Sequence, residues 1–131
     1  MKLIKTADAH CDIPCGIYEV DTLRNSAETC RRMVEILLDL QELQEHEHYN
    51  TFVRTVMNKE KHAQKVKDEV CILWTDYFKP EHFDEIDGLH DTLRKTAKQA
   101  SVVKQTVSVE EAERLVEMVK SVSDIFLETK K

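Results

Sequence analysis

Three side chains that can bind a metal lie close together near the start of the chain, in the segment HCDIPCGIY (residues 10–18). His10 offers an imidazole, and Cys11 and Cys15 offer two thiols. The Cys-x3-Cys spacing alone is a weak signal. The proline and the glycine that flank Cys15 sharpen it, because they favour a turn that folds both sulfurs back toward one point. The segment is therefore a candidate metal-binding hook.

The ligand set depends on whether the chain is cut before His10. A zinc site normally takes four side-chain ligands, and only three lie close together here. Cleavage between Ala9 and His10 would free the His10 α-amine. The amine, the deprotonated amide of Cys11 and the two thiolates would then form a planar N2S2 set, with the imidazole as an axial fifth ligand. Square-planar nitrogen and sulfur ligation suits Ni(II) or Cu(II).

The length and composition of the chain indicate a single, helix-rich domain. The chain has 131 residues, of which 34% are charged and only two are Gly and two Pro. This length is enough for a single core. Its apolar runs are too short for a membrane-spanning helix, so we expect no membrane partner. The net charge is −6, and no basic stripe with interleaved aromatic residues is present, so nucleic acid is not expected as a partner.

The first nine residues, MKLIKTADA, lack the apolar core of a secretion signal, because only Leu3 and Ile4 supply it. We therefore expect a cytoplasmic protein, in which structural disulfides are rare. Residues 1–9 then suit a short pro-segment of another kind. Cys30 and Cys71 lie on or beside helical apolar stripes, and we expect both to be packing residues.

Helical periodicity predicts four helices after Tyr18: residues 21–45, residues 47–78, a third that starts after Pro80 and reaches Ala100, and a fourth that opens at Ser108. Apolar residues recur at steps of three and four along each. In the order of the four predicted helices, these residues are Leu23, Ala27, Cys30, Val34 and Leu37; Tyr49, Phe52, Val56, Ala63, Val66, Val70, Leu73 and Tyr77; Phe83, Ile86, Leu89, Leu93, Ala97 and Ala100; and Leu115, Val119, Val122 and Phe126.

Local signals set the ends of these helices. Pro80 ends the second helix, because the residue before a proline avoids helical angles. Gly88 lies inside the third and weakens it by about 1 kcal/mol relative to Ala. Ser108 and Glu111 form a capping box for the fourth. The expected fold class is all-α: an antiparallel, up-down four-helix bundle over residues 21–131, with an irregular N-terminal metal-binding hook.

The hook closely resembles that of nickel-containing superoxide dismutases, whose pattern is H-C-D-x-P-C-G-x-Y. The matching residues are His10, Cys11, Asp12, Pro14, Cys15, Gly16 and Tyr18. The segment LWTDYFKPEHF (residues 73–83) is similar to the family's L-W-S-D-Y-F-K-P-x-H-F, and the C-terminal IFLETKK is similar to the family's ending. The resemblance covers almost the whole chain.

This resemblance implies a four-helix bundle that assembles as a homohexamer, with one nickel ion per chain. It implies an antioxidant enzyme that converts superoxide to dioxygen and hydrogen peroxide by Ni(II)/Ni(III) cycling. Thiolate and amide donors suit that cycle, because they stabilise Ni(III). A dedicated protease would remove residues 1–9 at the Ala9–His10 bond, leaving residues 10–131 as the mature domain.

The resemblance also assigns roles to single residues. Tyr18 and Tyr77 would order water and limit anion access at the open face of the metal. Lys79 would help to attract superoxide, and Asp12 is a further candidate near the metal. The family holds its axial imidazole with a Glu and an Arg, whereas alignment places Ser26 and His62 at those positions. Glu28 is a neighbouring substitute, so what holds the His10 imidazole stays open.

Other readings of the same residues remain. A non-catalytic nickel or copper carrier would use the same hook without turnover and would tolerate the pro-segment. A purely structural bundle would not depend on Cys11 or Cys15. The pairs Glu45–His48 and Asp87–His90 are reminiscent of di-iron bundles, but we expect solvated surface residues there. We expect Trp74 and Phe78 to pack in the core.

Overall fold

The structure, a computed structural model, describes residues 17–131. The described elements are α1 (Asp21–Asp39), α2 (His46–Ile72), a π-helical turn (Leu73–Tyr77), α3 (Pro80–Glu85), α4 (Leu89–Gln105) and α5 (Val109–Thr129). The pro-segment and the predicted metal ligands lie outside the described residues.

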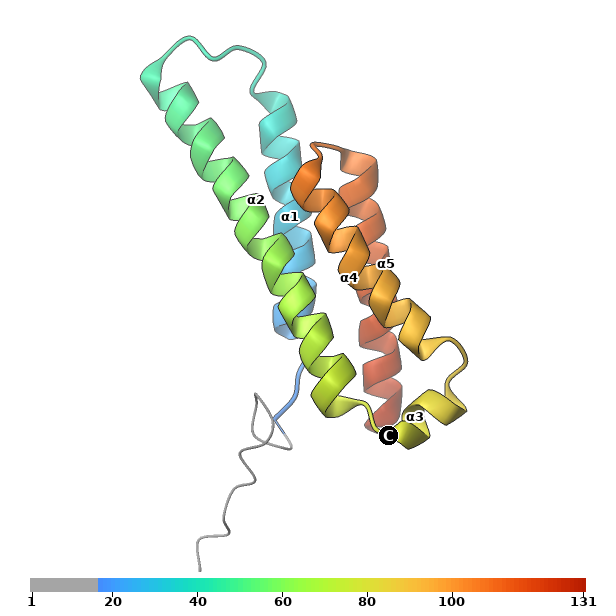
Figure 1. The fold of residues 1–131 in the computed structure, drawn as a ribbon. Helices are drawn as coiled ribbons and strands as arrows, with labels where there is room; N and C mark the ends of the chain where they lie inside the picture. Colours follow the sequence, from blue (N-terminus) through green and yellow to red (C-terminus); the bar gives the residue numbers. More distant parts are fainter. Residues whose placement is uncertain (1–16) are drawn as a thin grey trace, which may run out of the picture.

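The four long helices form an antiparallel bundle. Helix α1 packs against α2 and α5, and α4 packs against the same two neighbours. Successive long helices run in opposite directions, and α3 lies in the connection between α2 and α4 (Figure 1). The predicted all-α, up-down four-helix bundle is therefore confirmed. The apolar stripes of α1 and α5 are buried as predicted, with Leu23, Cys30 and Leu115 fully inaccessible.

Helix α1 is shorter than its predicted range of 21–45. It ends at Asp39, and residues 40–45 form the connection to α2. The prediction was wrong because it left only residue 46 for the chain to reverse direction between two antiparallel helices. Residues 40–45 read LQELQE, and none of them is buried.

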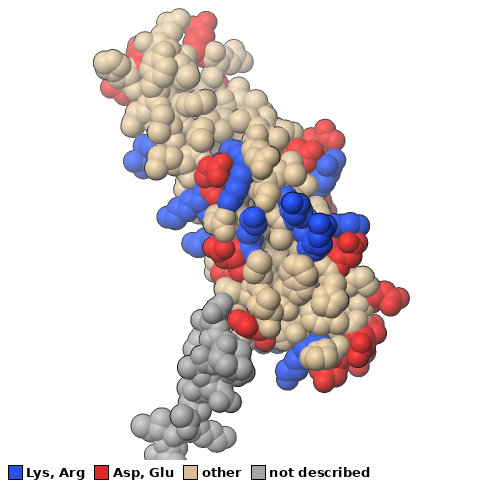
Figure 2. Space-filling view, in the orientation of Figure 1, with Lys and Arg blue, Asp and Glu red and all other residues tan. Residues whose placement is uncertain are grey.

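The α1–α2 hairpin projects beyond the end of the α4–α5 pair (Figure 1). The predicted α2 stripe is consequently buried only in its second half, at Ala63, Val66, Val70 and Leu73. Tyr49 is 50% exposed and Phe52 38% exposed, because no helix of the opposite pair reaches them. The surface of the hairpin tip that Figure 2 shows is mostly uncharged.

Helix α2 does not continue as a regular α-helix to residue 78. Its last turn widens into the π-helical turn, in which the Phe78 N–H donates to the Leu73 carbonyl at 2.8 Å. Such turns are rare in proteins, and those that occur often lie at functional sites. The chain then extends at Lys79, and Pro80 begins α3, so the predicted stop before Pro80 is confirmed. Phe78 is buried as expected, whereas Trp74 is only partly buried.

The predicted third helix is broken at Gly88, which separates α3 from α4. Gly88 has a φ of 72°, in the left-handed region, and is the N-cap of α4. A residue with a Cβ rarely adopts this conformation, so the glycine permits a sharp change of direction that an uninterrupted helix would lack. The expectation that Gly88 only weakens one continuous helix was wrong.

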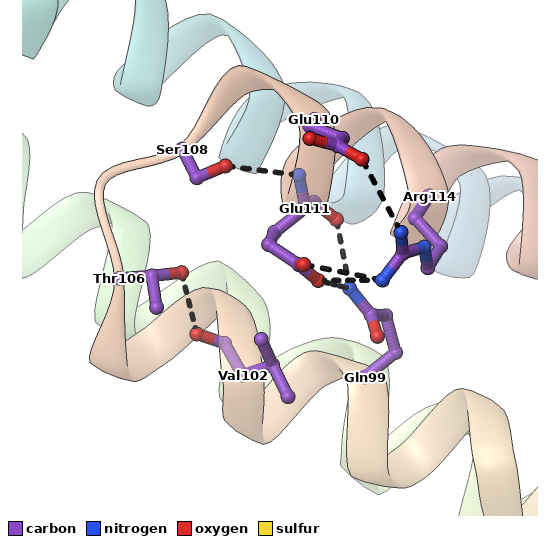
Figure 3. A network of polar contacts seen from close by, with 7 residues as sticks. All are labelled: Gln99, Val102, Thr106, Ser108, Glu110, Glu111 and Arg114. Carbon is purple, nitrogen blue, oxygen red and sulfur yellow. Dashed lines mark hydrogen bonds and ion pairs between the residues drawn. The ribbon is translucent and has the colours of Figure 1, made fainter.

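The turn between α4 and α5 is held by a polar network (Figure 3). The Ser108 hydroxyl accepts from the Glu111 N–H at 3.2 Å, so half of the predicted capping box is present. The Glu111 carboxylate does not complete the box; it accepts from Gln99 at 2.7 Å and pairs with Arg114 at 3.1 Å. Glu111 thus ties α5 to α4 instead of closing its own helix end.

A buried lysine joins three helices. Lys59 of α2 is only 2% exposed, and its ammonium donates to the carbonyls of Val103, Lys104 and Thr106 at 2.6–2.9 Å. These groups stand at the C-terminal end of α4, where carbonyls lack helical partners. The Cys30 thiol of α1 contacts the Lys59 carbonyl at 3.7 Å. Burial lowers the pKa of Lys59, although the charges of Glu60 and Cys30 oppose that effect.

The two cysteines of the described helices differ in their exposure to solvent. Cys30 is buried, as predicted, and burial raises the pKa of its thiol to about 11. Cys71 is exposed, so the prediction that it packs in the core was wrong. It lies one residue past the buried Val70 and therefore points away from the core face. None of the helices in residues 17–131 has both the length and the apolar composition that crossing a bilayer requires.

Candidate functional site

The end of the hook is anchored at one end of the bundle. Ile17 is exposed, but Tyr18 is buried, and Val20 is buried just before α1 begins. The Glu19 carboxylate accepts from the backbone N–H groups of Asp21 and Thr22 at 2.5 and 3.0 Å, and so caps the first turn of α1. The conformation of the chain is therefore set at the point where the hook joins the bundle.

Two carboxylates beside this junction have shifted pKa values. Burial would raise the pKa of Glu19, but its hydrogen bonds from Thr22 and Asp21 outweigh that effect and lower it. Burial, and after it the negative charge of Glu19, raises the pKa of Glu69 on α2, while Lys65 opposes this rise. The junction between hook and bundle thus places two acidic groups near one another.

Tyr18 meets Tyr77, although they lie 59 positions apart in the sequence. Their ring centroids lie 5.4 Å apart. Tyr77 comes from the π-helical turn and also contacts Phe126 of α5 at 4.7 Å and the buried Phe78 at 5.2 Å. The ring of His82 stacks on it at 6.0 Å with an interplanar angle of 12°. The two tyrosines that were predicted to stand near a metal are thus brought together.

These tyrosines form part of the wall of a pocket of about 340 Å³. Its lining residues are Tyr18, Asp76, Tyr77, Lys79, His82, Thr129 and Lys130. They come from the end of the hook, the π-helical turn, α3 and the last turn of α5. We refer to this pocket as the tyrosine pocket. The C-terminus and the start of α1 both lie at this end of the bundle (Figure 1).

Cationic and imidazole groups surround the tyrosine pocket. The exposed Lys79 lines it, as does Lys130, whose ammonium lies 5.5 Å from the Tyr77 ring centroid and 5.1 Å from that of Phe126. Cations are attracted to aromatic faces at such distances. The Lys79 backbone N–H donates to His82 Nδ1 at 3.0 Å, which leaves the proton of a neutral His82 ring on Nε2. The two lysines outnumber the single carboxylate of the lining, Asp76, so the pocket can attract a small anion.

The hydroxyl of Tyr77 is engaged at the end of α5. It lies 2.6 Å from the Thr129 hydroxyl, and Thr129 donates to the Phe126 carbonyl at 2.6 Å. A hydroxyl carries one proton and a carbonyl can only accept. Tyr77 is therefore the donor to Thr129.

Ser26 and His62 do not line the tyrosine pocket, but they lie at a common level of the α1–α2 pair. Cys30 and Lys59 touch across these antiparallel helices. One turn earlier on α1 is Ser26, and about one turn later on α2 is His62. Ser26 is buried, and His62 Nδ1 lies 2.8 Å from the Asn58 carbonyl. That nitrogen is the donor, so the Nε2 of a neutral ring can accept a hydrogen bond.

Other candidate groups have different surroundings. Glu28 pairs with Arg31 at 2.8 Å and lines a groove between α1 and α5. His90 accepts from the Trp74 indole at 3.0 Å and stacks on Phe83 at 3.9 Å. Within residues 17–131, no group of three or more His, Cys, Asp or Glu side chains could hold a metal ion.

The sequence-predicted site residues thus fall into three groups. Tyr18, Tyr77 and Lys79 meet at the tyrosine pocket. Ser26 and His62 lie further along the α1–α2 pair. The predicted ligands His10, Cys11 and Cys15, together with Asp12, lie outside the described residues.

Sequence reasoning missed four residues of the pocket, Asp76, His82, Thr129 and Lys130. A signal for them was present, because Asp76 and His82 lie in LWTDYFKPEHF, and Thr129 and Lys130 lie in IFLETKK. Both segments resemble a known family, but that resemblance by itself assigns no role to these residues. Neither segment alone shows that its polar residues face a common pocket.

Comparison with known proteins shows a relationship along almost the whole chain. Residues 5–130 match the sequence model of nickel-containing superoxide dismutases. The superoxide dismutase (Ni) of Streptomyces coelicolor is 33% identical over 126 residues, which cover 96% of this chain and 92% of the relative. That of Streptomyces seoulensis is 32% identical over 123 residues, which cover 94% of this chain and 89% of the relative.

Solved structures agree with the sequence relatives. A native nickel superoxide dismutase structure superposes with a TM-score of 0.81 at 31% identity, covering 93% of this chain and 100% of the other. A crystal structure of nickel-containing superoxide dismutase with the Ni ligation of the oxidised state superposes with a TM-score of 0.81 at 29% identity. It covers 92% of this chain and 98% of the other.

Proposed function

This chain belongs to the family of nickel-containing superoxide dismutases, and from that basis we propose how its own residues bind nickel and handle superoxide. It is an enzyme, a nickel-dependent superoxide dismutase. One observation carries the proposal for the site. The end of the HCDIPCGIY segment and the LWTDYFKPEHF segment, far apart in the sequence, line a single pocket through Tyr18, Tyr77 and Lys79.

We assign the nickel ligands to the hook. After removal of residues 1–9, His10 would supply its amine and imidazole, Cys11 its amide nitrogen and thiolate, and Cys15 a second thiolate. This mixture of nitrogen and thiolate donors fits nickel. Bound nickel supplies the one-electron Ni(II)/Ni(III) couple that oxidises one superoxide to dioxygen and reduces the next. The complete reaction converts two superoxide anions and two protons into dioxygen and hydrogen peroxide.

The residues of the pocket act on the substrate and on water. Lys79, together with Lys130, attracts the superoxide anion toward a protein whose net charge is −6. The packed rings of Tyr18 and Tyr77 narrow the approach, so that a small anion enters and a larger one does not. Their polar ends hold water at the wall of the pocket. The pocket residues thus assist the approach of superoxide, exclude larger anions and order water.

Residues outside the pocket are assigned by position. Ser26 and His62 share one level of the α1–α2 pair, which supports a joint role in orienting the His10 imidazole. A neutral His62 presents Nε2 as an acceptor for an imidazole N–H, a bond type that commonly orients metal-bound histidines. Asp12 lies inside the hook sequence and is assigned to the surroundings of the metal.

The assignment is tested by comparing two nickel-loaded proteins, one that begins at His10 and one that keeps residues 1–9. We expect rapid superoxide decay only with the trimmed protein, because in the longer chain the His10 nitrogen is a peptide amide and not an amine. Cys11→Ser and Cys15→Ser should each abolish the activity of the trimmed protein, and His10→Ala should slow turnover while some nickel stays bound. Equal activity of the trimmed and untrimmed proteins would refute the role of the amine.

We further propose a homohexamer in the cytoplasm, processed by a protease at the Ala9–His10 bond. Assembly is supported by exposed apolar side chains on one face of α2, at Tyr49, Val53 and Met57, since contiguous apolar surface marks interfaces. Light scattering of the trimmed protein should give six times the mass of one chain. Cell fractionation followed by N-terminal sequencing tests both location and cleavage site.

A further inference from the structure

Tyr77 is the meeting point of the tyrosine pocket, and the last turn of α5 determines which way its hydroxyl proton points. The two hydrogen bonds run in one direction: Tyr77 donates to Thr129, and Thr129 donates to the Phe126 carbonyl. Both oxygen–oxygen distances are 2.6 Å. They are short for hydroxyl hydrogen bonds, which indicates that both are well formed.

The direction of this chain follows from the position of Thr129 in its helix. The last four carbonyls of a helix have no intrahelical partner, and Phe126 is the first of these in α5. Threonine near a helix end commonly donates back to such a carbonyl. The backbone therefore takes the only proton of Thr129 and leaves its oxygen as an acceptor for Tyr77.

The surroundings of Tyr77 hold the phenol in place for this bond. Its ring is packed by Tyr18, His82 and Phe126, and the Lys130 ammonium covers the ring at 5.5 Å. Rotation of the ring would disrupt these contacts. The hydroxyl oxygen still has lone pairs that can face the pocket, whereas its proton does not.

We propose that Thr129 is a positioning residue that makes Tyr77 a hydrogen-bond acceptor toward the pocket. Tyr77 then accepts from a water molecule or from hydrogen peroxide, and it does not donate a proton to the superoxide anion. The protons that the reaction consumes therefore come from other groups or from solvent. This inference rests on the proposed function, because it concerns the substrate and water of that site.

The test uses two substitutions at one position. Thr129→Val keeps the shape of the side chain but removes the oxygen, and Thr129→Ser keeps the oxygen. In nickel-loaded protein beginning at His10, we expect Thr129→Val to lower kcat/KM for superoxide by about 2- to 10-fold, the effect of one hydrogen bond. Thr129→Ser should stay close to the unsubstituted protein.

A double-mutant cycle identifies the partner. If Thr129 acts through the Tyr77 hydroxyl, Thr129→Val should have no further effect once Tyr77→Phe has removed that hydroxyl. Thr106→Val is the matched control, because the Thr106 hydroxyl makes a similar donation to the Val102 carbonyl at the end of α4 (Figure 3). That end of α4 and the C-terminus beside the pocket lie at opposite ends of the bundle (Figure 1). A loss with Thr106→Val of the same size, or a loss with Thr129→Val that persists beside Tyr77→Phe, would overturn the proposal.

A second measurement needs neither nickel nor activity. In the metal-free full-length chain, the ¹³Cζ resonance of Tyr77, identified by its loss in Tyr77→Phe, reports on the hydrogen bond that the phenol donates. Thr129→Val should shift this resonance, Thr129→Ser should not, and the distant, half-exposed Tyr49 is the internal reference. An unshifted resonance refutes the proposal. Absence of superoxide decay in the trimmed, nickel-loaded, unsubstituted protein would instead refute the proposed function, and the resonance would still decide the bond.

Discussion

Tyr77 contacts several separate segments at the tyrosine pocket. It touches the end of the hook through Tyr18, the next turn of the chain through His82, and α5 through Phe126 and Thr129. Three other segments must therefore be in place before its ring and hydroxyl are fixed. A substitution at His82, Phe126 or Thr129 therefore acts on the pocket without changing a residue of the hook.

The lysines of the pocket lead to a prediction about ionic strength. Lys79→Gln and Lys130→Gln should each lower kcat/KM at low salt by about 2- to 5-fold, because attraction of an anion across several ångströms is lost. Above about 0.5 M salt, where screening is strong, the variants and the unsubstituted enzyme should converge. Lys95→Gln, which removes an exposed lysine paired with Asp91 on α4, is the charge-matched control. A loss that does not depend on salt would speak against electrostatic attraction.

The cysteines of the bundle should differ in chemical reactivity. Burial raises the pKa of Cys30 to about 11, and the thiolate is the reactive form. In a Cys11→Ser/Cys15→Ser background at pH 8, an alkylating reagent should modify the exposed Cys71 and spare Cys30 until the protein is unfolded. Mass spectrometry of peptides measures both sites. Equal labelling of both cysteines in the folded protein would contradict the buried position of Cys30.

At the scale of elements, the start of α1 links the hook to the bundle through Glu19. Its lowered pKa means that the folded state prefers the carboxylate. The stability it contributes is therefore fully present above pH 4.5, the ordinary pKa of glutamate, and is lost as the pH falls through the lower pKa of the folded state.

Glu19→Gln should accordingly reduce the free energy of unfolding by about 0.5–1 kcal/mol at pH 7, as the loss of a helix cap does. The difference from the unsubstituted protein should shrink toward pH 3, where both proteins carry a neutral side chain. Thermal unfolding at a series of pH values measures this. Glu117→Gln, at an exposed glutamate within α5, is the control. It should show no difference in the free energy of unfolding that shrinks as the pH falls from 7 to 3. A constant difference between pH 3 and pH 7 would rule out the carboxylate as the stabilising group.

At the scale of the whole molecule, Lys59 connects α1, α2 and α4. Its ammonium has three protons, and three carbonyls at the end of α4 accept them. Lys59→Met should lower the free energy of unfolding by about 2–4 kcal/mol, because it leaves those carbonyls without their donor. Urea denaturation at a fixed protein concentration measures the change.

The exposed Lys61 on the same helix provides the control for this experiment, since Lys61→Met removes an equal charge from a solvated position. It should change the free energy of unfolding by less than about 0.5 kcal/mol. If Lys59→Met proved as mild as Lys61→Met, the buried ammonium would not be the group that holds α4 to α2.

The sequence by itself determined the local features. Helical periodicity located the bundle and most of its core, from Leu23 on α1 to Phe126 on α5, because burial on one face repeats every three or four residues. Pro80 ends a helix for a local steric reason, which does not depend on any other segment of the chain. The types and spacing of His10, Cys11 and Cys15 indicated a site for Ni(II) or Cu(II), because ligand preference is a local property of the donor groups. The resemblance to a known family then implied nickel.

The tertiary structure alone decided features that depend on distant segments. The early end of α1 follows from the chain reversal before α2, and the break at Gly88 from the change of direction between α3 and α4. The exposure of Tyr49 follows from where the opposite pair of helices stops, and periodicity contains none of this information. The tyrosine pocket is of the same kind, because Tyr18, Tyr77 and Thr129 become neighbours only when the hook, the π-helical turn and α5 pack together. A hydrogen bond across 52 positions has no local signature, and so the role of Thr129 could be inferred only from the folded chain.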